Sequence, residues 1–153
     1  MNPLAIYQAA LDVVSEAVLA NDFAAYSLMI DLPYLVLTNR AQLLVTREED
    51  LRPTFDALHV GLRARGVQYY KRLARKAHYA DHGRIEGWHF THLMSATDFA
   101  APSRSARQVI VQRGGRWLFS EAQYPIAADR WPLSESMLFS DPSQLESTEG
   151  AQQ

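Results

Sequence analysis

Two histidines lie three residues apart in the segment Trp88-His89-Phe90-Thr91-His92 and are candidates for acid–base chemistry. In a strand, side chains alternate between two faces, so His92 shares a face with Trp88 and Phe90 while His89 takes the other. The more apolar face should turn inwards. The pattern therefore predicts that His92 lies in a pocket as a general acid or base, and that His89 faces outwards. The alternative is a hydrogen-bonded, purely structural histidine.

Glu121 is the second candidate for catalysis. It shares strand parity with Trp117 and Phe119, whose aromatic side chains are typical of a core. A carboxylate drawn inside with them must be paired, hydrogen-bonded or shifted in pKa. We therefore predict that Glu121 lines the same pocket as His92 and acts with it as an acid–base pair. A solvated carboxylate at the pocket rim and a structural ion pair are the alternatives.

Aromatic residues supply the predicted wall of this pocket. Aromatic bodies with a polar tip suit a small apolar ligand, so Tyr34, Tyr70 and Trp117 are predicted to bind it. The same residues also suit packing within a sheet. No metal site is predicted, because the two histidines point to opposite faces without a carboxylate at ligand spacing. No cofactor is predicted either, because the only Gly-Gly pair is a hairpin turn.

Basic residues are concentrated at residues 69–80, which carry Lys71, Arg72, Arg75 and Lys76. They alternate in pairs, so both faces of a strand would receive positive charge. We expect them to be mainly solvated side chains on the outer face of a sheet, balanced by acids. A phosphate-binding surface is the alternative.

Composition excludes several classes of protein. The chain of 153 residues has no cysteine, which excludes disulfides and thiolate catalysis. A net charge of −2 and a pI near 6.2 argue against nucleic-acid binding. No apolar run is long enough to span a membrane, and the first residues lack the features of a signal peptide, so a cytoplasmic location is expected.

Hydrophobic periodicity predicts helices first and strands afterwards. Helices are expected over residues 3–20 and 23–29, and over a third segment that a Thr46–Glu49 capping box opens and Gly66 ends. Pro53 should kink this helix or split off its first turn. Strands are expected over residues 32–37, 42–45, 69–80, 85–95, 104–113 and 116–124. The first two strands could pair as a hairpin, and the last four should form an antiparallel meander.

This order of elements resembles the nuclear transport factor 2-like (NTF2-like) superfamily, in its SnoaL-like branch. The resemblance covers residues 4–124 and rests on Asn21-Asp22-Phe23, the strand Leu35–Leu37, the Thr46–Glu49 helix entry and Gly115-Arg116-Trp117-Leu118-Phe119. It implies an α+β, cone-shaped fold with three helices packed on a strongly curved, mostly antiparallel sheet. Residues 1–133 would form this single domain, and residues 134–153 a polar, mobile tail.

The resemblance implies several functions without choosing among them. One is binding of a small apolar molecule in the cone, with cofactor-free isomerase, dehydratase or cyclase chemistry. The ketosteroid isomerase activity of the superfamily is not expected, because its base position falls on Asn39 and its tyrosine position on Ser15. The alternative is a non-catalytic subunit resembling the small subunit of aromatic-ring hydroxylating dioxygenases. A homodimer is expected through the outer sheet face, where Leu93, Ile110 and Leu118 are predicted to lie.

Overall fold

The computed structural model of the protein describes residues 2–96 and 104–139. Its helices are α1 (Pro3–Leu19), α2 (Phe23–Ser27), the 3₁₀ helix η1 (Glu48–Leu51), α3 (Arg52–Ala64) and α4 (Glu135–Leu138). Its strands are β1 (Ile30–Leu37), β2 (Gln42–Val45), β3 (Tyr69–Asp81), β4 (Arg84–Met94), β5 (Arg104–Arg113) and β6 (Arg116–Gln123). The described residues therefore contain one short α-helix more than the three predicted.

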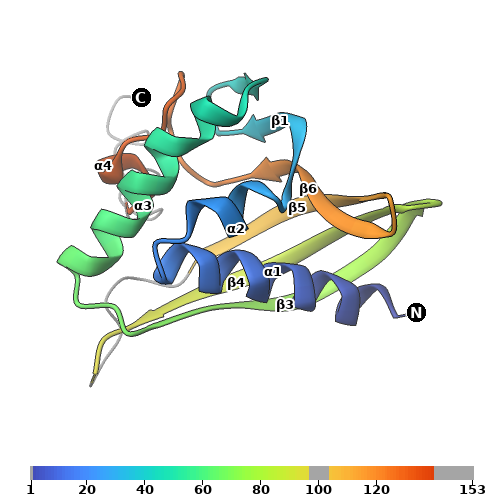
Figure 1. The fold of residues 1–153 in the computed structure, drawn as a ribbon, viewed down its shortest axis with the longest axis horizontal. Helices are drawn as coiled ribbons and strands as arrows, with labels where there is room; N and C mark the ends of the chain where they lie inside the picture. The colour runs from blue at the N-terminus through green and yellow to red at the C-terminus, as the bar shows by residue number, and fades with distance from the viewer. Residues whose placement is uncertain (1, 97–103, 140–153) are drawn as a thin grey trace, which may run out of the picture.

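The six strands form one mixed sheet in the order β2-β1-β6-β5-β4-β3. Strands β3 to β6 form the predicted antiparallel meander, and β1 and β2 form the predicted hairpin. The two parts join where β1 pairs in parallel with β6. The helices pack on one face of this sheet, which we call the inner face (Figure 1).

The helix starts follow local chemistry. Asn2 caps α1 by accepting a hydrogen bond from the backbone N–H of Leu4, and Asp22 caps α2 through the N–H of Ala25. The predicted Thr46 capping box does not form, because the residue that caps η1 is Arg47, without a side-chain hydrogen bond. Pro53 splits this first turn from α3, as predicted, since its ring excludes a continuous α-helix through residues 48–53.

Helix α1 lies along β3 and β4 and closes the open edge of the sheet (Figure 1). Its apolar side chains, such as Leu11 and Val18, are fully buried in the core. Gln8 fixes its position: the side-chain amide donates to the carbonyl of Arg72 and accepts from the N–H of Ala74, both at 2.8 Å. Because β3 is an edge strand, this amide satisfies backbone groups that no further strand pairs.

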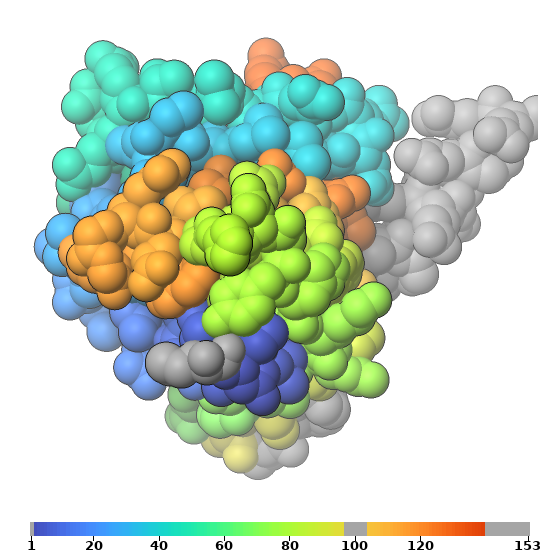
Figure 2. All heavy atoms as spheres, turned by 90° about the vertical axis from the view of Figure 1, so that its right-hand side faces the viewer, coloured from blue at the N-terminus to red at the C-terminus, as the bar shows by residue number. Residues whose placement is uncertain are grey.

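The sheet is strongly curved, as a contact between Tyr79 of β3 and Trp117 of β6 demonstrates. In a flat sheet these strands would lie three strand spacings apart, roughly 14 Å. The two ring centroids are only 6.4 Å apart, so the sheet curves with its inner face concave and brings β3 and β6 close together at this end. Figure 2 views this end of the molecule, where the β3–β4 hairpin (green) and the β5–β6 hairpin (orange) lie beside the start of α1 (dark blue).

Part of the predicted mobile tail is structured. Ser134 caps α4, and the ring of Phe139 lies so close to Gly61 of α3 that a Cβ there would come within 2.2 Å of it. Arg65 holds the same segment through Glu135, at 3.0 Å, and stacks on the Phe139 ring. Residues 140–153 lie outside the described residues. In the described part of the chain, no helix is long and apolar enough to cross a membrane.

Candidate functional site

A cavity of about 110 Å³ lies between the helices and the inner face of the sheet. Such a space exceeds what a single water needs and suits a small organic molecule. Helices α1 and α3, strands β1 and β3 to β6, and the segment 124–139 all contribute to its wall. The polar or charged side chains of this wall are Tyr26, Tyr34, Thr54, Tyr70, Arg72, His89, Thr91, Arg104, Gln108 and Tyr124.

A buried pair of polar residues lies beside this cavity. The hydroxyl of Tyr7, from α1, lies 2.6 Å from Nδ1 of His89, from β4. Tyr7 is fully buried and His89 is 1% exposed. Gly87 makes this pairing possible because it has no side chain, and the Tyr7 ring packs directly against its backbone. A Cβ atom at position 87 would lie only 2.6 Å from the Tyr7 ring.

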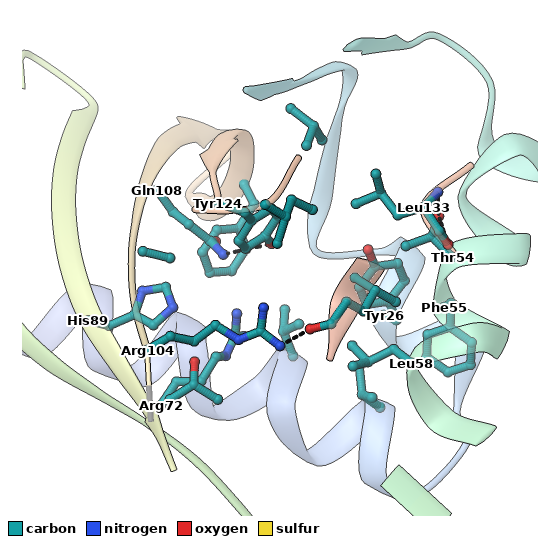
Figure 3. Close-up of a pocket in the computed structure, with 18 of the residues that line it drawn as sticks. Tyr26, Thr54, Phe55, Leu58, Arg72, His89, Arg104, Gln108, Tyr124 and Leu133 are labelled. Atoms are coloured by element: carbon teal, nitrogen blue, oxygen red, sulfur yellow. Dashed lines mark hydrogen bonds between the residues drawn. The ribbon is translucent and has the colours of Figure 1, made fainter. Parts of the chain in front are cut away.

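The hydrogen-bond geometry assigns a tautomer to His89. If Tyr7 donates to Nδ1, both groups are satisfied, whereas the reverse direction leaves the buried phenol proton without an acceptor. The neutral ring then carries its proton on Nε2. Every fully enclosed side-chain nitrogen or oxygen of the described residues has a partner, and none is found for Nε2. This N–H therefore borders the cavity, as Figure 3 illustrates for the His89 ring.

Burial sets the charge state of the pair. It lowers the pKa of His89 well below the ordinary value, and the positive charge of Arg72 lowers it further. Burial likewise raises the pKa of Tyr7, so the phenol stays protonated. At neutral pH the pair is thus an uncharged donor–acceptor chain that ends in a hydrogen-bond donor.

Phenols form a second polar group on the cavity wall. Tyr34 and Tyr124 both line the cavity, and Gln108 donates to the Tyr124 hydroxyl at 3.2 Å. Burial raises the pKa of Tyr34 and of Tyr124, so both remain neutral donors. No aspartate or glutamate belongs to the described wall of the cavity. The site is therefore rich in donors and poor in bases.

The residues predicted to bind a ligand are divided between two places. Tyr34 and Tyr70 line the cavity. Trp117 lies on the inner face, as predicted, but contacts Tyr79 at the curved end of the sheet and is not part of the described cavity wall. Phe119 lies on the inner face too, and it shares the cavity wall with Val14 and Val18 of α1.

The predicted orientation of the histidines is wrong, because the two faces of β4 are reversed. His89, Thr91 and Leu93 line the cavity, so His92 points to the outer face with Trp88 and Phe90. Long cationic side chains of β3 cover these outer aromatics. Arg75 lies 4.9 Å from the Phe90 ring centre and Lys76 lies 5.0 Å from that of Trp88. This cover lets large aromatic side chains occupy the outer face.

The predicted orientation of Glu121 is also wrong, because β6 contains a bulge. Residues 119 and 121 pair with neighbouring residues of β5, which leaves Ser120 as an extra residue and reverses the parity after it. Glu121 is paired across the sheet with Leu35, which is directed outwards because its neighbours Tyr34 and Val36 line the cavity. The bulge thus separates Glu121 from the face of Phe119.

On the outer face Glu121 belongs to an ion-pair network. Arg107 binds the carboxylates of both Glu121 and Glu86, the latter at 2.8 Å, and His78 lies 3.3 Å from Glu86. This network is the structural alternative that the sequence left open for Glu121. Two residues predicted for the outer face are also inside: Leu93 lines the cavity, and Ile110 is fully buried in the core.

Sequence reasoning missed Tyr7, Gly87 and Arg72 as parts of the site. The signal that could have found them is Gly87, because a glycine inside a strand marks a close approach of another group. Gly87 and His89 are two residues apart in β4, so the close approach at Gly87 also marks the face on which His89 lies. Among the described residues, no group of three or more His, Asp or Glu side chains is placed to hold a metal ion.

Comparison with known proteins identifies the fold. No family model and no curated protein matches the sequence. Solved structures do match, although at low identity. An NTF-2-like protein of unknown function from Shewanella oneidensis aligns with a TM-score of 0.56 and 12% identity, over 78% of this chain and 95% of that one. A protein from Catenulispora acidiphila aligns with a TM-score of 0.58 and 15% identity, over 78% of this chain and 87% of that one.

A third similar structure is a protein of Novosphingobium aromaticivorans that is proposed to be a scytalone dehydratase. It aligns with a TM-score of 0.53 and 9% identity, over 82% of this chain and 90% of that one. The chain therefore has the α+β, cone-shaped NTF2-like fold, and this prediction from the sequence is confirmed. At 9 to 15% identity the likeness concerns the fold alone, and function has to be argued from the site.

Proposed function

We propose that the protein binds a small, mostly apolar molecule in the cavity, and that an oxygen of this molecule accepts a hydrogen bond from His89. The observation that carries the proposal is the buried Tyr7–His89 pair, which ends in a donor at an otherwise largely apolar cavity. A buried polar pair of this kind costs stability unless both members are satisfied. A ligand oxygen would give the remaining N–H its partner.

The same groups define the chemistry that the cavity can support. Neutral His89 and the cationic Arg72 can stabilise negative charge on a carbonyl or enol oxygen, which is the requirement of cofactor-free isomerisation, dehydration or cyclisation. No carboxylate lines the described wall to serve as base, and His89 presents a donor rather than a free acceptor, because Tyr7 occupies its Nδ1. We therefore place binding first and acid–base catalysis second.

The alternative function is that of a non-catalytic subunit. A closed cone with apolar walls and a large apolar outer face would favour this alternative. The buried Tyr7–His89 pair and Arg72 give the cavity a polar side instead. The outer face carries the Arg107 ion-pair network beside its aromatics. Both observations favour a ligand site.

The experiment compares two substitutions on neighbouring positions of β5. Ala106 lines the cavity, and Ser105 lies on the opposite face of the same strand and is exposed. Ala106→Phe should fill the cavity, whereas Ser105→Phe adds the same ring outside. Binding of small aromatic and alicyclic carboxylates and amides is followed by the fluorescence of Trp131, which lines the cavity.

The proposal predicts that Ala106→Phe abolishes binding and that Ser105→Phe retains the affinity of the unchanged protein. Melting temperatures of both variants establish that they are folded. Equal binding by the two variants would contradict the proposed site, as would the absence of binding to any member of the panel.

We also propose that two copies pair through the outer sheet face. Leu44 is 59% exposed, and it pairs with the outward-facing Leu35. Leu118 of β6 and the half-buried Trp88 of β4 add apolar side chains to the same face. Light scattering should give the dimer mass, and Trp88→Glu should give the monomer mass. A monomer mass for the unchanged protein up to millimolar concentration would contradict the pairing.

A further inference from the structure

A row of three side chains crosses the floor of the cavity. The strand register places Thr91 of β4 directly opposite Arg72 of β3 on one side and Arg104 of β5 on the other. Side chains that are directly opposite one another point to the same face of a sheet, and all three line the cavity. Figure 3 shows the two guanidinium groups side by side, next to the His89 ring.

Arg72 is a buried cation without an acidic partner in the part of the chain that the structure describes. It is 5% exposed. Its guanidinium donates to two neutral oxygens, the Ser15 hydroxyl at 2.9 Å and the Leu11 carbonyl at 3.1 Å. These bonds use Nε and one terminal nitrogen. Among the described residues no partner is found for the other terminal nitrogen. Because every fully enclosed side-chain nitrogen or oxygen of these residues has a partner, this nitrogen borders the cavity.

The neighbourhood of Arg72 makes this charge costly. The second guanidinium, that of Arg104, lies on the same wall and donates to the backbone carbonyl of Leu138. Two like charges on one cavity wall repel each other, and a buried cation is stable only with a counter-charge or strong hydrogen bonds. The described wall supplies no carboxylate. A bound anion would supply a counter-charge to this wall.

The cavity has two chemically different sides. Arg72, Thr91, His89 and Arg104 lie on the strands, whereas Phe55 and Leu58 of α3 lie across from them (Figure 3). Thr91, which lies between the two arginines, and Ala106, which lies opposite His89, have small side chains on this wall. A ligand with a charged head and an apolar body would match both sides at once.

We propose that the ligand is a small carboxylate whose carboxylate group binds Arg72 and Arg104 above Thr91, with its apolar body against α3. This inference rests on the proposed function, since it specifies the head group of the molecule bound in that cavity. A carboxylate suits the planar guanidinium fork and leaves one oxygen for the N–H of His89. It also supplies the counter-charge that the described wall lacks.

The test compares matched ligands that differ only in charge. Benzoate, phenylacetate and cyclohexanecarboxylate are titrated beside their primary amides, and phenylphosphonate is added as a different anion. Trp131 fluorescence reports binding. We expect the carboxylates to bind about tenfold or more tightly than the amides, as charge-assisted hydrogen bonds require.

Variants assign the preference to Arg72. Arg72→Met should remove the carboxylate preference while amide binding persists, and Arg72→Lys should retain part of it. Arg75→Met is the matched control, because Arg75 lies on Phe90 outside the cavity. Its affinities for both series should equal those of the unchanged protein. Melting temperatures with and without ligand establish that each variant is folded.

The outcomes separate this inference from the proposed function. Equal binding of carboxylates and amides, or a preference that survives in Arg72→Met, overturns the carboxylate head group and leaves the ligand cavity standing. Tighter binding of phenylphosphonate than of benzoate also overturns it, in favour of a phosphate-like group. Binding of no member of either series contradicts the proposed function itself.

Discussion

The Tyr7 hydroxyl lies 2.6 Å from Nδ1 of His89, although the two residues are 82 positions apart in the chain. Helix α1 thereby contributes directly to the orientation of a group on β4. Tyr7→Phe removes the donor and leaves a buried nitrogen unsatisfied, which costs about 1–3 kcal/mol of unfolding free energy. Urea unfolding should show this loss.

Tyr69→Phe is the control for this substitution, because Tyr69 is 51% exposed and lies outside the cavity wall. It should change the unfolding free energy by less than about 0.5 kcal/mol. Equal stability of the Tyr7→Phe and unchanged proteins would mean that the hydrogen bond contributes nothing to the fold.

Gly87→Ala tests the close approach that brings the pair together. The new methyl group would meet the Tyr7 ring at 2.6 Å, so the ring has to move away from His89. Overpacking of this kind costs about 1–3 kcal/mol. The Gly87→Ala, Tyr7→Phe double variant should lose less than the sum of the single losses, because both act on one contact. Strict additivity would contradict the coupling.

The pH dependence of stability should contain a contribution from His89. Its pKa is lowered in the folded protein, by burial first and by Arg72 second, so the unfolded chain takes up a proton at a higher pH than the folded one. The contribution is complete above the unfolded value, near pH 6.5, and is lost as the pH falls towards the folded pKa. Stability should therefore decrease on acidification.

His89→Gln isolates this contribution. Between pH 7.5 and 5.5 the unchanged protein should lose about 1 kcal/mol more unfolding free energy than the variant does. Tyr7 remains protonated over this range and adds no titration of its own, because burial raises its pKa. Parallel pH profiles for the two proteins would mean that His89 takes up its proton in the folded state as readily as in the unfolded chain.

Glu121→Gln tests the structural role that the ion-pair network gives to this residue. The Glu121 and Arg107 side chains are 18% and 16% exposed, so loss of the pair should cost about 1 kcal/mol at most after screening by solvent. Ligand affinity in the cavity should not change. A loss of binding at constant melting temperature would show that Glu121 serves the site after all.

The order of elements could be predicted because it depends on local signals. Residues 104–113 contain the β-branched run Val109-Ile110-Val111 and end at Gly114-Gly115, whose φ angles of 57° and 80° form the tight turn that the sequence indicates. Asn21, with φ of 57°, ends the first helix in the same way. Such signals need no knowledge of distant residues.

The faces of the strands could not be predicted in the same way. The orientation of β4 depends on which face α1 covers. The large aromatics Trp88 and Phe90 indicate the wrong inner face, and the correct one is marked only by Gly87, against which the Tyr7 ring packs. The orientation of Glu121 depends on one extra residue in β6, and nothing in the residues around Ser120 marks a bulge. Each error assigns a side chain to the wrong face of the sheet. As a result His92 and Glu121 were predicted to form an acid–base pair in the cavity, whereas both lie on the outer face.

The most direct test of the account is a crystal structure of the protein with the carboxylate of the panel that binds most tightly. The ligand should lie in the cavity, with a carboxylate oxygen about 3 Å from the Arg72 guanidinium, a hydrogen bond from Nε2 of His89, and the apolar body against Phe55 and Leu58. A ligand on the outer sheet face, or one in the cavity with its carboxylate turned away from Arg72 and His89, would contradict it.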